Sequence, residues 1–102
     1  MWLSELSPEW KRMVCSMHRM GFGSIRNLTI RNGQPVLSPR PQLVRVVKVG
    51  EPKPAALPQE FALKKEIVDL HAELSGLQNA VILSLEVRHG LPFRYTLEEN
   101  AA

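Results

Sequence analysis

Apolar residues recur at helical spacing in residues 8–20. Those on one helical face are Trp10, Met13, Val14, Met17 and Met20. Ser7 can cap the free backbone N–H groups at the start, and Pro8 suits the first turn because an N–H would have no partner there. Gly21 suits the end of the helix. The methionine-rich stripe is predicted to be core, with an adaptable binding surface as the alternative.

A second helix is predicted from about Pro58 or Gln59 to Leu74 or Ser75, with Gly76 as its stop. One apolar stripe along this helix comprises Leu63, Ile67, Leu70 and Leu74. A narrower stripe, nearly opposite, comprises Phe61, Val68 and Ala72. Because a helix that is apolar on two sides is usually sandwiched, we expect the narrower stripe to be an interface. Its partner is a second copy of the chain, the first helix or the linker.

Alternating apolar and polar residues predict two β-hairpins. Residues 25–31 lead into an Asn32-Gly33 turn, which is a strong signal for a two-residue hairpin loop, and residues 79–88 lead into His89-Gly90. Strict alternation in the second hairpin predicts one buried face. The apolar residues assigned to that hairpin's alternating pattern are Val81, Leu83, Leu85, Val87, Phe93, Tyr95 and Leu97.

Both turns lie in a nine-residue pattern that occurs twice, 57 residues apart. Residues 28–36 read Leu-Thr-Ile-Arg-Asn-Gly-Gln-Pro-Val, and residues 85–93 read Leu-Glu-Val-Arg-His-Gly-Leu-Pro-Phe. Turn chemistry explains much of the pattern, because Gly, Asn and His tolerate a positive φ better than most residues do. Internal duplication is therefore one hypothesis, and convergence on the same turn is the other.

These segments predict an α+β fold in which two helix–β-hairpin units form one antiparallel sheet of about five strands, with two helices on one face. Residues 43–49 supply the additional strand. A single domain is predicted over residues 1–98, with half 1 at 7–49 and half 2 at 59–97. Residues 50–58 form a proline-rich linker between the halves. Residues 99–102 are predicted to be a frayed tail.

The composition is that of an ordinary globular protein, with 44% apolar residues in a chain of 102. Cys15 is the single cysteine, so no intrachain disulfide can form, and this favours a reducing compartment. The N-terminus lacks a basic region followed by an apolar run, and no apolar run is long enough to cross a membrane. We therefore expect a cytoplasmic protein with no membrane association.

Charge is distributed unevenly along the chain. Residues 1–50 contain eight Lys or Arg and two Glu, a net +6, whereas residues 51–102 contain five Lys or Arg and eight Asp or Glu, a net −3. Such asymmetry favours either an anionic partner for the basic half or attraction between the halves, within one chain or between subunits. Simple solvation of surface charges is the third interpretation.

Signals for catalysis are weak. The sequence has no phosphate-binding glycine loop, no G-x-S-x-G and no H-E-x-x-H, so we expect a non-enzymatic protein without a cofactor. Cys15 and His18 are three residues apart on a helix, and His71 on the second helix could add a third zinc ligand. A fourth ligand is lacking, and the alternative is that these three are ordinary half-buried or surface groups.

Arginines occupy the same position in both copies of the repeated pattern, immediately before the turn. Arg31 and Arg88, together with Arg94, Arg45 and Lys48, are the residues that we predict for nucleic-acid binding, because arginine can hold a phosphate through two hydrogen bonds. Two considerations oppose this assignment. The uncovered sheet face lacks stacking aromatics in a strictly alternating pattern, and an arginine beside a turn often pairs with a cross-strand carboxylate.

The sequence thus favours a small non-enzymatic interaction module, which associates with a protein partner or with itself through Phe61, Val68 and Ala72. The alternative is a nucleic-acid-binding protein that uses an arginine-bearing sheet face.

Overall fold

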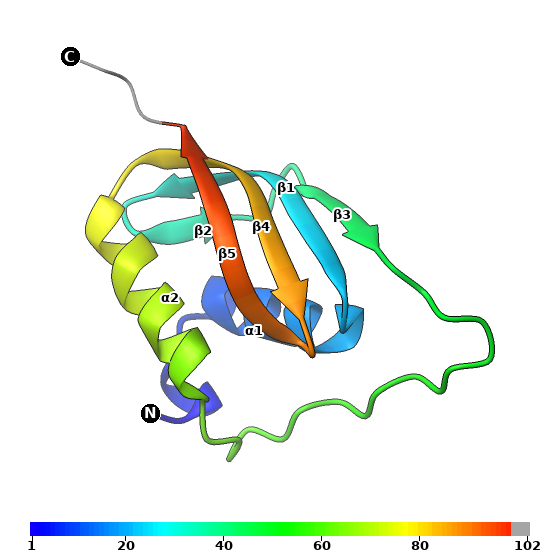
Figure 1. The fold of residues 1–102 in the computed structure, drawn as a ribbon. Helices are drawn as coiled ribbons and strands as arrows, with labels where there is room; N and C mark the ends of the chain where they lie inside the picture. The colour runs from blue at the N-terminus through cyan, green and yellow to red at the C-terminus, as the bar shows by residue number, and fades with distance from the viewer. Residues whose placement is uncertain (99–102) are drawn as a thin grey trace.

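The computed structural model describes residues 1–98, and residues 99–102, predicted to be a frayed tail, lie outside the described residues. The elements, after a short 3-10 turn at Leu3–Glu5, are α1 (Pro8–Met20), β1 (Gly23–Arg31), β2 (Gln34–Val36), β3 (Gln42–Arg45), α2 (Lys65–Leu77), β4 (Ala80–Arg88) and β5 (Leu91–Glu98). Figure 1 shows both helices on one side of the sheet. The predicted α+β class is confirmed.

The sheet has five antiparallel strands in the order β2-β1-β4-β5, and β3 also pairs with β1. β2 pairs with the C-terminal end of β1, where Thr29 faces Val36. β3 pairs with the N-terminal end of the same strand, where Arg26 faces Gln42. The two strands therefore share one edge of β1, and β4 occupies the other.

The core lies between the helices and the covered face of the sheet. All five residues of the apolar stripe on α1 are at most 5% exposed, which confirms that the methionines are core. The buried residues contributed by α2 are Ile67, Leu70 and Leu74. The buried strand residues are Ile25, Leu28, Ile30, Ile82, Leu85 and Val87. Burying each such side chain contributes roughly 1.5–3 kcal/mol to folding.

The predicted ends of α1 are confirmed. The Ser7 hydroxyl accepts a hydrogen bond from the Trp10 backbone N–H and donates one to Oε1 of Gln34. Gly21 ends the helix with a φ of 71°. Nε1 of Trp10 donates to the carbonyl oxygen of Gly33 at 3.2 Å, so the helix start is tied to the first hairpin turn.

The predicted limits of the second helix are wrong at both ends. The helix begins at Lys65, because the residues before it pair with the N-terminus: the N–H of Leu3 donates to Phe61 and the N–H of Leu63 donates to Met1. Gly76 lies inside the helix, which ends at Leu77 and is followed by the capping residue Gln78 with a φ of 63°. A backbone partner from the start of the chain therefore replaces the first two predicted helical turns.

The predicted alternation fails in the middle of β4. Ile82 is fully buried, whereas Val81 and Leu83 are 37% and 39% exposed. The cause is a register irregularity between Ile82 and Ser84 in the pairing with β5. Such an irregularity moves the following side chains to the opposite face of the strand.

The predicted strand at 43–49 is shorter than expected. β3 ends at Arg45, which faces Gly23 at the beginning of β1, so β1 offers no residues for further pairing in this register. The N–H of Val46 still donates to the Phe22 carbonyl, at 2.8 Å. Beyond this bond the chain leaves the sheet in a wide excursion, drawn in green in Figure 1.

The elements of the two halves correspond at the same interval as the sequence pattern. Adding 57 to the first and last residue numbers of α1 gives those of α2, and adding 57 to those of β1 gives those of β4. The same interval also carries the turn residues Asn32 and Gly33, with φ of 54° and 73°, onto His89 and Gly90, with φ of 53° and 72°. Internal duplication remains a hypothesis, and this correspondence supports it.

The hairpin turn of each half donates a backbone hydrogen bond to the helix end of the other half, and we call this pair of bonds the exchanged contact. The N–H of Gly33 donates to the carbonyl of Gln78 at the end of α2, and the N–H of Gly90 donates to the carbonyl of Gly21 at the end of α1, both at 2.9 Å. A Cβ on Gly33 would lie 2.8 Å from the backbone oxygen of Ser75. Each turn thus needs its glycine for a positive φ, and the first also needs it for the close approach of a helix.

We expect Gly33→Ala to destabilise the protein by about 2 kcal/mol or more, because alanine is strained at positive φ and its methyl group would clash with α2. The matched change is Gly76→Ala, which meets no atom within 4 Å. That variant should be more stable than the parent by about 0.5–1 kcal/mol, because glycine weakens a helix. Urea unfolding midpoints measure both effects, and equal midpoints for the two variants would contradict the role of the turn.

Candidate functional site: an arginine-lined cleft

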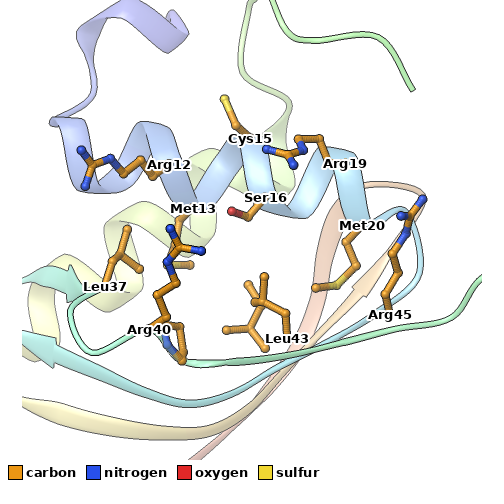
Figure 2. A pocket seen from close by; sticks show the side chains of 12 residues that line it. Arg12, Met13, Cys15, Ser16, Arg19, Met20, Leu37, Arg40, Leu43 and Arg45 are labelled. Carbon is orange, nitrogen blue, oxygen red and sulfur yellow. The ribbon is translucent and has the colours of Figure 1, made fainter. Parts of the chain in front are cut away.

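A cleft of about 710 Å³ opens between α1 and the segment that runs from Leu37 to Arg45. Figure 2 shows α1 along one wall and this segment along the other. The arginines that line it are Arg12, Arg19, Arg40 and Arg45. Its volume falls within the usual range for small-ligand sites, roughly 300–1,000 Å³.

The cleft exists because the returning strand of the first hairpin is interrupted. On β1, three positions separate Thr29 from Arg26, but their partners Val36 and Gln42 are six positions apart. Three surplus residues therefore loop out between β2 and β3, and neither strand pairs with Leu28. Prolines at positions 39 and 41 suit such a break, because proline has no N–H to donate to a sheet.

The second half closes the corresponding space. There β5 is continuous, and Tyr95 pairs with Leu85, the residue that corresponds to Leu28. The Tyr95 hydroxyl donates to Oε1 of Glu73 on α2 at 2.8 Å, so strand and helix are joined directly. The same architecture is thus open in half 1 and closed in half 2.

The charge of the cleft is positive throughout. No carboxylate is among the residues that line it, and none of its four arginines takes part in an ion pair within residues 1–98. Uncompensated guanidinium groups around one hollow raise the local potential and attract anions. Arginine also offers paired donors that match the geometry of phosphate and carboxylate groups.

The floor of the cleft is apolar. Its exposed apolar surface comes mainly from Leu37 and Leu43, because Met13, Met20 and Ile25 lie beneath it and are at most 5% exposed. Leu43 is 54% exposed, although it corresponds in the sheet to the partly buried Leu97 of β5. Cys15 and Ser16 also line the cleft, but no histidine or carboxylate lines it with them to act as a base. The arrangement is therefore suited to binding an anion that also carries apolar surface.

The five residues predicted to bind nucleic acid do not lie on one surface. β1 and β4 are antiparallel, so Arg31 and Arg88, which end these strands, lie at opposite ends of the sheet. Arg45 lines the cleft, on the helix side. Lys48 is exposed in the segment after β3, and Arg94 is on the open face of the sheet, where it pairs with Glu86.

Phe93 belongs to the alternating apolar pattern of the sequence, but the structure places it on the other face. A register shift between Glu86 and Val87 turns its ring toward the open face, where it is 52% exposed. The guanidinium carbon of Arg88 lies 4.0 Å from the ring centroid and that of Arg94 lies 5.8 Å from it. The open face therefore has an aromatic ring beside two arginines. No alternation pattern could have revealed this, because the bulge reverses the parity of the strand.

The ion pair between Glu86 and Arg94 joins facing residues of β4 and β5. The two arginines that precede the turns, Arg31 and Arg88, form no such cross-strand pair within residues 1–98. The hydrogen bond and charge of Arg94 lower the pKa of Glu86, and Glu86 raises the pKa of Arg94. Both groups are exposed to solvent, so the pair adds little stability.

The three weak metal candidates have separate surroundings. Nε2 of His18 donates to the carbonyl of Ala55 at 2.8 Å. His71 packs its ring edge-on against Trp10, with 4.8 Å between centroids, and Cys15 lines the cleft. Within residues 1–98 no three His, Cys, Asp or Glu side chains form a group that could hold a metal ion.

The three residues predicted to form an interface do not share a helical stripe. Phe61 precedes α2, is half-buried against the core, and its carbonyl accepts the Leu3 N–H. Val68 is half-buried and Ala72 is exposed on the helix itself. Self-association through these residues stays a prediction.

Neither helix in the described part of the chain combines the length and the apolar character needed to span a membrane. Comparison with protein-family models, curated proteins and solved structures yields no match. The function of the cleft is therefore inferred from its own residues.

Tyr95, the only tyrosine, reports on the closed half of the molecule. Its pKa is raised above 10.0, first by burial and then by the hydrogen bond and charge of Glu73. We expect Glu73→Gln to lower this pKa but to leave it above the ordinary value, because the contribution of burial persists. Phenolate absorbance during a pH titration measures the shift, and urea-unfolded protein is the control.

The raised pKa of Tyr95 also predicts how the stability of the folded state depends on pH. A group whose pKa is higher in the folded state stabilises that state fully below its unfolded pKa, and this contribution disappears as pH rises through the folded pKa. The contribution of Tyr95 should therefore disappear only in alkaline solution. Identical titrations of folded and unfolded protein would contradict the contact with Glu73.

Proposed function

We propose that this protein is a non-enzymatic binding module, and that the arginine-lined cleft holds nucleic acid through its phosphate groups. One observation carries the proposal: four arginines surround a single cleft that no carboxylate lines. Neutralising phosphates with arginine releases the counterions that surround a nucleic acid, which is the main source of sequence-independent affinity.

The positions of the arginines favour an anion with several charges. Arg12 and Arg19 are seven residues apart on α1, which places their Cα atoms about 10 Å apart along the helix axis. In Figure 2 the Arg12 side chain lies at one end of the cleft, while Arg19 and Arg45 lie toward the other. A chain of phosphates matches this spread better than a single phosphate does. The net charge of +6 on residues 1–50 acts in the same direction.

A second candidate is association with an acidic protein surface, including a second copy of this chain. The observation that favours it is the acidic character of the exposed residues of α2, where Glu66, Asp69 and Glu73 outnumber Lys65. Such a surface complements the basic cleft in charge, and a helix lying in an apolar groove is a common mode of recognition. Light scattering at high concentration tests this candidate, because a strict monomer would exclude self-association.

To test the cleft, we would replace Arg19 and Arg40 with serine and measure anisotropy of a labelled single-stranded RNA at about 50 mM and about 200 mM salt. The parent should bind at low salt and weaken steeply as salt rises. For every phosphate that the variant no longer neutralises, the slope of log affinity against log salt should fall by about 0.7. The double variant should therefore bind more weakly than the parent and with a shallower slope.

The matched control replaces Lys53 and Lys64, two exposed cations outside the cleft, with serine and so removes the same net charge. We expect the control to stay close to the parent in both affinity and slope. Equal reductions in the two variants would show that only net charge matters, and absence of binding at low salt would overturn the proposal.

A further inference from the structure

A row of exposed rings and cations leads from the cleft, around one end of the sheet, to the open face. We call it the end track, and its members after Arg45 are Phe22, His89, Arg88, Phe93 and Arg94. Phe22 is 41% exposed and Phe93 is 52% exposed. Single exposed apolar residues are common on protein surfaces, but two aromatic rings that alternate with arginines along one path form a more informative surface.

Ring contacts, a backbone hydrogen bond and chain neighbours connect the members of the track. Arg45 ends β3, and the N–H of the following Val46 donates to the carbonyl of Phe22 at 2.8 Å. The Phe22 ring packs edge-on against His89, with 4.7 Å between centroids and 69° between planes. Arg88, the residue before His89, lies over the Phe93 ring at 4.0 Å.

The backbone holds these side chains in place. The turn that carries His89 is fixed to the end of α1 by the hydrogen bond from the Gly90 N–H to the Gly21 carbonyl, at 2.9 Å. In the sheet, Gly23 faces Val87 and Val87 faces Pro92, so Phe22 and Phe93 adjoin residues on strands that flank β4. Two strand spacings place them about 10 Å apart, close enough for one flexible strand to contact both.

We infer that the end track is a base-stacking platform, and that the cleft and track together select single-stranded over double-stranded nucleic acid. The inference rests on the proposed function, since the cleft supplies the phosphate contacts. Exposed aromatic rings stack on unpaired bases, whereas the bases of a duplex are stacked on one another and cannot reach a ring on a protein surface. Arg88 places a cation beside the stacked base.

The experiment replaces Phe22 and Phe93 with leucine, alone and together, and leaves every arginine in place. Affinity for a short single-stranded RNA should fall roughly tenfold for each ring removed. The salt slope should stay unchanged, because the same arginines still neutralise the same phosphates. The control is Leu83→Ala, which trims an apolar side chain that is 39% exposed and lies outside the track, and it should bind RNA as the parent does.

Two further probes separate bases from phosphates. Inorganic polyphosphate has no bases, so it should bind the parent and the double leucine variant equally. An RNA duplex should bind the parent more weakly than the single strand does, and the leucine substitutions should not change its affinity. Urea midpoints of the variants check that these exposed substitutions leave folding intact.

Failure of the two proposals gives different results. If the parent binds neither RNA nor polyphosphate at low salt, the proposed function fails and the inference fails with it. If the parent binds RNA but the leucine variants bind it equally well, or if duplex and single strand bind alike, the cleft remains a phosphate site and the stacking platform is overturned.

Discussion

The exchanged contact between each hairpin turn and the helix end of the other half is the constraint on which the fold depends. Gly33 must approach the end of α2, and Gly90 must approach the end of α1, with matching hydrogen bonds of 2.9 Å. The antiparallel pairing of β1 with β4 brings both contacts into place at opposite ends of the sheet. The buried residues of both helices and of β1 and β4 also belong to one hydrophobic cluster, so the two halves share a core.

The two halves differ in the space between the helix and the returning strand of the hairpin. In half 2 the strand is continuous, and Tyr95 joins it to Glu73 of α2. In half 1 three surplus residues loop out and leave the arginine-lined cleft. The helix residues differ along with the strands, since Arg12 and Ser16 correspond to Asp69 and Glu73. These differences between the halves leave the exchanged hydrogen bonds in place.

Features that depend on local chemistry were predictable from the sequence, and features that depend on pairing across the chain were not. The helix cap at Ser7, the end at Gly21 and both hairpin turns follow from the residues at those positions. The start of α2 does not, because the N-terminal segment captures the residues before Lys65 as a backbone partner. The face of the sheet on which Phe93 lies and the presence of the cleft could not be predicted either. Both arise from changes in the pairing between strands, which the sequence of one strand does not reveal.

The same register changes bring together the chemistry that the proposals use. The loop-out between β2 and β3 exposes the apolar floor and places Arg40 opposite α1, while the shift in β4 and β5 turns Phe93 outward beside Arg88. Irregularities in a sheet cost hydrogen bonds or packing, and they tend to occur where a side chain must be re-aimed. The loop-out lies opposite the middle of β1, and the shift at Val87 lies opposite Gly23 at its start, so the two irregularities are within a few residues of each other along this strand. Their coincidence is why cleft and end track are best understood as one extended surface for a flexible polyanion.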